Sequence, residues 1–104
     1  MPRSRSSKFR AEPEHARDVD AFLRTERGLS HLHARRRADL ITIESGPEGD
    51  RSPHARLRRV GVHRWQLEMA THDGRWQPTP LRASMEELLV MLVDEFGWTL
   101  QQLG

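Results

Sequence analysis

The histidines are the side chains of this sequence best suited to catalysis or metal binding. There are six, and His31 and His33 form an H-x-H pair whose imidazoles would share one face of a strand. A metal site needs at least one more ligand, and no other histidine or carboxylate stands at a spacing that marks one out. The chain also lacks a G-x-S-x-G motif and the glycine-rich loops that bind phosphates. We therefore expect no enzyme, no metal site and no cofactor.

Arginine dominates the charged residues and is the residue type best suited to contact phosphate. All 17 basic residues except Lys8 are arginines. Residues 1–11 hold four basic residues and no acid, so the rest of the chain has 13 basic against 15 acidic residues, a net charge of −2. The candidates for phosphate contact are Arg3, Arg5, Arg35, Arg36, Arg37, Arg56, Arg58 and Arg59.

Two features of these arginines argue against a nucleic-acid surface. The part of the chain that contains most of them is slightly negative, and no exposed aromatic residue stands among them as a stacking platform. The competing interpretation is a solvated arginine face paired with nearby acids.

The composition indicates one small domain. The chain has 104 residues, of which 36% are hydrophobic and 31% charged, as in a soluble single domain. No run approaches the ~20 apolar residues of a membrane span, and no apolar signal segment follows the N-terminal charges. The absence of cysteine fits a reducing compartment. We expect a cytoplasmic protein with no membrane contact, in which residues 1–11 are a disordered basic tail and residues 12–104 form one α+β domain.

Two amphipathic helices are expected, one near each end of this domain. The first begins at Pro13 and ends at Gly28, with apolar residues at helical spacing between them. The second covers residues 84–96, where Ser84 and Glu87 have the spacing of a capping box.

Val90 and Met91 flank the acidic side of the second helix instead of lying on its apolar stripe. They are either half-buried at the edge of the domain or part of a contact with another subunit. With Trp98, they form the candidate protein interface, for an unknown protein partner or for a second copy of the chain in a homodimer. Leu100 and Leu103 would fold back with Trp98 over the end of the sheet.

Between the helices the pattern predicts strands. Residues 39–45 (DLITIES) alternate as a strand, the polar loop at 45–53 ends it, and residues 54–60 (HARLRRV) form the next one. Residues 29–38 fit either a helical turn or the lead into a strand.

The next segment is expected to form two strands and not one, because of the position of one arginine. One unbroken strand from Leu57 to Met69 would place Arg59 on the same face as the apolar residues, and burying a lone arginine is too costly. A turn or bulge near Gly61 is therefore expected to separate two strands.

The stretch RWQLEMATHDGRW holds two tryptophans on either side of an Asp-Gly pair. This pair predicts a two-residue type I′ turn, which would pair Thr71 with Trp76. Trp65 and Trp76 would then share one face of the sheet but lie about 20 Å apart, too far to form a clamp. We expect both to belong to the core.

The fold expected from these elements is α+β, an antiparallel four-stranded meander that ends at Pro78 and Pro80 and has both helices on one face. A strand with Ile-Glu, then SPHARLRRV, then RWQLEMATHDGRW, then an acidic and apolar helix ending in FGW resembles a group of small bacterial domains of unknown function. The resemblance covers roughly residues 15–100. It implies the same order of elements and no particular activity.

For function, the exposed features favour a protein-interaction or oligomerisation module. The alternative is an accessory nucleic-acid-binding protein that uses the basic tail and the strand arginines. The two differ in the surface they use, so the structure of the arginine face and of the Trp98 end bears on both.

Overall fold

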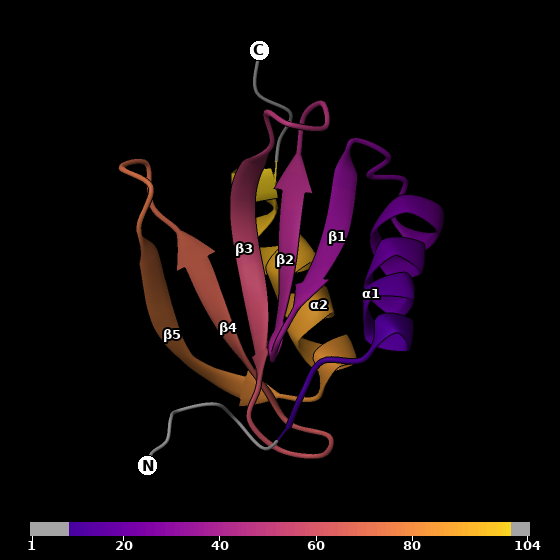
Figure 1. The fold of residues 1–104 in the computed structure, drawn as a ribbon, viewed down its shortest axis with the longest axis vertical. Helices are drawn as coiled ribbons and strands as arrows, with labels where there is room; N and C mark the ends of the chain where they lie inside the picture. The colour runs from indigo at the N-terminus through magenta and orange to yellow at the C-terminus, as the bar shows by residue number, and fades with distance from the viewer. Residues whose placement is uncertain (1–8, 101–104) are drawn as a thin grey trace.

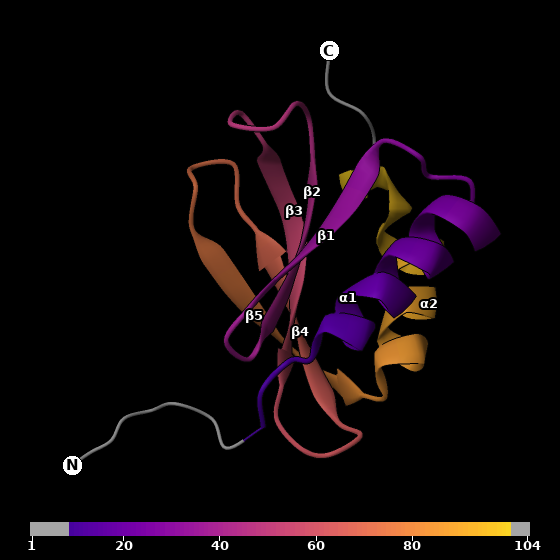
Figure 2. The ribbon, with the colours of Figure 1, turned by 45° about the vertical axis from the view of Figure 1, so that its right-hand side comes forward.

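A computed structural model of the chain describes residues 9–100. Its elements are α1 (Pro13–Asp20), a π-helical turn (Ala21–Glu26), β1 (Leu32–Arg37), β2 (Leu40–Ser45), β3 (Ser52–Arg59), β4 (Trp65–Ala70), β5 (Trp76–Ala83), α2 (Met85–Phe96) and a 3-10 turn (Gly97–Leu100). Each strand pairs antiparallel with the next, in the order β1-β2-β3-β4-β5 (Figure 1). Both helices lie on the same face of the sheet (Figure 2). The predicted α+β class is confirmed, but the sheet has five strands and not four.

The additional strand is β1, formed by the segment whose structure the sequence left open. The sequence of β1 does not show the usual alternation of apolar and polar residues. Arg36 pairs with Ile41 and so occupies a position on the face that the helices cover, where an apolar residue would be expected. Although β1 is an edge strand, its free edge is partly closed, since the side chain of Asp20 accepts a hydrogen bond from the N–H of Ala34 at 2.8 Å.

The ordered chain begins before Glu12. Ala11, which was expected to lie in a disordered tail, is 1% exposed and donates its N–H to the carbonyl of Ala38 at 2.9 Å. Its own carbonyl accepts from the guanidinium of Arg36 at 3.3 Å. Of the expected tail, residues 1–8 lie outside the described residues.

β5 runs through Pro78 and Pro80, where the sequence predicted that a strand would end. As the last strand of the described sheet, it has one unpaired edge, at which a missing N–H removes no ladder bond. The pairing with β4 is irregular beside these prolines, where the hydroxyl of Thr79 donates to the carbonyl of Leu67 at 2.8 Å. The prolines therefore mark an edge strand and not the end of the sheet.

Trp65 and Trp76 lie on opposite faces of the sheet, contrary to the prediction. In the loop between β4 and β5 only Gly74 has a positive φ, whereas a type I′ turn requires two such residues. The longer turn pairs Trp76 with Ala70 and not with Thr71. A shift of one residue moves a side chain to the other face, so only Trp65 enters the core.

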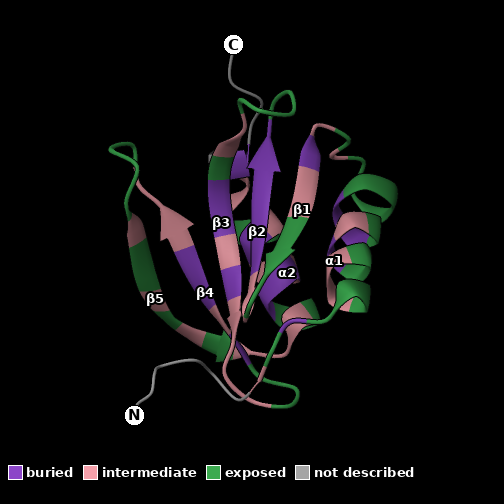
Figure 3. Cartoon of the chain, in the orientation of Figure 1, coloured by how far each residue is buried: buried purple, intermediate pink, exposed green. Residues whose placement is uncertain are grey.

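The core lies between the sheet and the helices, and the buried residues of the sheet are concentrated on β2, β3 and β4 (Figure 3). The predicted division near Gly61 is confirmed, since β3 ends at Arg59 and β4 begins at Trp65. At the end of α2, Leu100 is 1% exposed and covers the core as expected, whereas Trp98 is exposed. Among the described residues, no helix has the length and apolar character needed to cross a membrane.

Candidate functional site

The face of the sheet opposite the helices carries four of the eight candidate arginines, Arg35, Arg37, Arg56 and Arg58. We call it the outer face, and within residues 9–100 no helix or strand packs against it (Figure 2). One row of paired residues crosses all five strands on this face: Arg37, Leu40, Arg58, Gln66 and Arg82. The neighbouring row contains Arg35, Thr42, Arg56 and Glu68. Five arginines of β1, β3 and β5 therefore face the same side, which brings together residues that are far apart in the sequence: Arg35, Arg37, Arg56, Arg58 and Arg82.

Glu68 forms ion pairs with two arginines of this face. Its carboxylate, 9% exposed, accepts from Arg56 and, at 3.2 Å, from Arg58, whose guanidinium also reaches Asp39 at 3.1 Å. Burial alone would raise the pKa of Glu68, but the hydrogen bonds and charges of the two arginines outweigh it and hold the pKa below its ordinary value of 4.5. One carboxylate thus fixes two guanidiniums.

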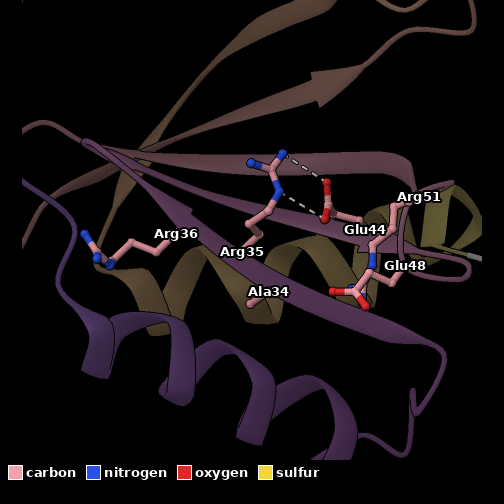
Figure 4. Close-up of a pocket in the computed structure, with 7 residues that line it drawn as sticks. Ala34, Arg35, Arg36, Glu44, Glu48 and Arg51 are labelled. Carbon is pink, nitrogen blue, oxygen red and sulfur yellow. Dashed lines mark hydrogen bonds and ion pairs between the residues drawn. The ribbon is translucent and has the colours of Figure 1, made fainter.

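Arg35 and Glu44 form a second ion pair on the outer face. Two guanidinium nitrogens of Arg35 donate to the two oxygens of Glu44, at 3.2 and 3.1 Å, and this hydrogen bonding raises the pKa of Arg35 (Figure 4). A shallow pocket of about 590 Å³ lies beside the pair, and Arg51 from the β2–β3 loop also lines it. Arg36 extends away from these groups, so the basic side chains of this pocket do not converge on one point (Figure 4).

Trp76 stands among the arginines of the outer face. The guanidinium of Arg56 lies 4.3 Å from the centre of its ring, and the side chain remains partly exposed. The sequence interpretation missed this residue because it placed Trp76 on the other face. It also missed Arg82, because it ended the strand at Pro78 and Pro80. Only the pairing register of β4 with β5 identifies these two residues.

Two of the candidate arginines hold the N-terminal segment instead of facing outward. Arg36 donates to the carbonyl of Ala11, and Arg59 donates to the carbonyls of Arg10 and Val62, at 2.8 and 2.7 Å. Arg3 and Arg5 lie outside the described residues. The phosphate-contact candidates thus divide into a group on the outer face, a pair with a structural role and two tail residues.

A second surface lies beside the β4–β5 hairpin and the C-terminal end of α2. There, a groove of about 1120 Å³ separates the β4–β5 hairpin from the end of α2. Its walls are mainly apolar and include Met69, Leu81, Phe96 and Trp98. Trp98 is 71% exposed, and Val62, at the other end of the sheet, is the second large apolar side chain that is exposed in the described chain.

The three residues of the predicted protein interface do not form one surface. Val90 and Met91 are half-buried and pack against the core, which matches one of the two alternatives left open for them. Neither lines the groove, so of the three only Trp98 belongs to it.

One of the histidines that line this groove contacts a buried serine. A bulge in β3 opposite Ile43 inserts His54, whose Nε2 lies 2.7 Å from the hydroxyl of Ser45. Both side chains are 6% exposed, and Ser45 does not line the groove. Such a serine has no access to a substrate. In the described part of the chain, no three potential ligands come together as a metal site.

Comparison with known proteins places this fold within a family but adds no activity. No curated protein and no solved structure matches the chain significantly. A family described as a domain of unknown function does match, over residues 5–98, which is nearly the entire chain and confirms the resemblance seen in the sequence. The chain therefore belongs to this family, Domain of unknown function (DUF3024).

Proposed function

We propose that this domain is a protein-interaction module, without catalytic activity, that holds an uncharged apolar segment of a partner polypeptide in the groove beside Trp98. The observation that carries the proposal is Trp98 itself, which is 71% exposed at the wall of an apolar groove. An exposed indole next to an apolar concavity is the arrangement typical of interface residues that dominate binding energy.

The chemistry of the groove defines its partner. Of the residues that line it, only His54 and His72 are ionisable, and no carboxylate, lysine or arginine is among them. A charged segment would lose its hydration there without meeting an opposite charge, so apolar side chains are favoured. Pro78 and Pro80 lack the N–H groups that an added strand would need, so the partner binds through side chains and not by extending the sheet.

Replacing Trp98 with serine is expected to weaken binding of such a segment about tenfold or more. Peptides selected from a random phage-displayed library on the full-length chain provide the probe, and their affinity is measured by isothermal titration calorimetry. Val62→Ser is the matched control, since it removes the other exposed large apolar side chain and should leave affinity unchanged. Met91→Glu is less suitable, because Met91 packs against the core.

Three outcomes would contradict the proposal. The first is that the selected peptides are all charged, and the second is that none of them distinguishes Trp98→Ser from Val62→Ser. The third outcome concerns the occupant: if light scattering shows a dimer that Trp98→Ser converts to a monomer, the groove holds a second copy of the chain instead of a separate partner.

A further inference from the structure

We propose that the outer face of the sheet is a binding site for single-stranded nucleic acid, with phosphates against the arginine row and an unpaired base against Trp76. No arginine lines the groove beside Trp98, and neither does Trp76, so the two proposed sites use different side chains. The proposal therefore stands independently of the protein-interaction function.

The first argument is the balance and layering of charge. Five arginines lie on the outer face, against the three carboxylates of Asp39, Glu44 and Glu68. The side chain of Glu44 is 8% exposed, whereas that of its partner Arg35 is 53% exposed. The carboxylates thus lie beneath the guanidiniums and hold them in place, and the face presents a net positive layer to solvent. Arginines that are already ordered lose less conformational entropy when they bind phosphate.

The second argument is the position of two arginines that form no ion pair with a described residue. Arg37 and Arg82 are exposed and form no ion pair with any residue between 9 and 100. They stand at the two ends of the arginine row, with Arg58 between them. With strands about 4.8 Å apart, the row spans about 19 Å. Three guanidiniums spread over this width suit a row of successive phosphates and not a single small anion.

The third argument is Trp76, which removes the objection raised from the sequence that no aromatic residue accompanies the arginines. Its partner Ala70 stands four residues along β4 from Gln66, so the indole lies about 13 Å from the row. The guanidinium of Arg56 lies 4.3 Å from the centre of the Trp76 ring and forms an ion pair with Glu68. These two contacts hold the indole in place. Only an unpaired base can stack on such a side chain, since the bases of a duplex are stacked on each other.

Fluorescence anisotropy of a labelled 20-nucleotide oligothymidylate, titrated with the full chain at several salt concentrations, tests the site. Three phosphate contacts predict that log K falls with log[salt] with a slope of about −2. The double variant Arg37→Glu/Arg82→Glu should lower affinity at least tenfold and make the slope shallower by about 1.4, the share of two contacts. Arg17→Glu/Arg24→Glu is the matched control, because it changes net charge equally at two exposed positions of the helical segment before β1.

Two further variants distinguish the contributions to binding. One separates base stacking from charge, and the other separates the outer face from the N-terminal tail. Trp76→Ala should lower affinity about fivefold or more and leave the salt slope unchanged, because stacking releases no counterions. Arg3→Ser/Arg5→Ser/Lys8→Ser removes three of the four basic residues of the tail within the full chain and should preserve binding. Loss of binding in this tail variant, equal losses in the two double-reversal variants, or no binding at all would overturn the proposal. So would equal binding of a duplex, or competition by polyglutamate as effective as by unlabelled oligonucleotide.

Discussion

Trp65→Ala is expected to lower the free energy of unfolding by about 3 to 5 kcal/mol, whereas Trp76→Ala should lower it by only about 1 kcal/mol. Trp65 is 2% exposed and belongs to the core on the helix side of the sheet. Its ring meets the imidazole of His15 edge-on, with centroids 5.0 Å apart, and so joins α1 to β4. Removing the indole leaves a cavity between the sheet and the helices, and these layers cannot move together to fill it because other contacts hold them apart.

Trp76, in contrast, is not part of the hydrophobic core. It is partly exposed on the outer face, where its main partner is the guanidinium of Arg56. Equilibrium urea denaturation of both variants, followed by circular dichroism, measures the difference. If the two substitutions cost the same free energy, Trp76 would share the core with Trp65, and the pairing of Ala70 with Trp76 would be wrong.

Glu68→Ala is the second substitution for which a large effect is expected, a loss of about 3 kcal/mol of stability. The carboxylate is 9% exposed and is shared by Arg56 and Arg58, which are themselves 18% and 34% exposed. Without it, two partly buried guanidiniums lose a charged partner, and Arg56 loses the contact that holds it over Trp76.

Glu44→Ala is the matched control for Glu68→Ala. Glu44 is as deeply buried, at 8%, but its one partner Arg35 is 53% exposed and can return to water. This variant should lose about 1 kcal/mol or less. Chemical denaturation of both proteins at pH 7 compares them, and equal losses would mean that sharing the carboxylate between two arginines adds nothing.

The lowered pKa of Glu68 also predicts how stability depends on pH. A carboxyl group whose pKa is lower in the folded than in the unfolded chain stabilises the fold fully above the unfolded pKa, near 4.5. This stabilisation disappears as the pH falls from about 5 through the folded pKa. The free energy of unfolding of the wild-type protein should therefore decrease over this range more steeply than that of Glu68→Gln, which carries no titrating group. Parallel curves would show that Glu68 is not responsible.

The sequence was sufficient where local signals and packing agree. The capping box of Ser84 and Glu87 is present at the start of α2, and the cost of burying Arg59 correctly separated β3 from β4. Trp65 was correctly placed in the core because it alternates with other apolar residues of its own strand. Each of these inferences depends on residues within one element or its immediate ends.

Long-range pairing is what the sequence could not supply. The acids that fix the arginines are distant in the chain, with Glu68 ten residues from Arg58, and only the β3–β4 register brings them together. The Asp-Gly pair predicted a register that differs by one residue from the observed one, and this difference placed Trp76 on the core face instead of the outer face. The prolines of β5 concealed Arg82 because their effect depends on whether a strand is central or at an edge.

The meander order of the sheet has a consequence for how fast this chain folds. Every strand pairs with its neighbour in the sequence, and no connection crosses from one edge of the sheet to the other. Each pairing therefore closes only a short loop, and hairpins of this kind form in about 1 to 10 microseconds. Because local pairings keep the relative contact order low for a sheet of this size, folding should be faster than in β-sandwiches whose strands meet partners far along the chain.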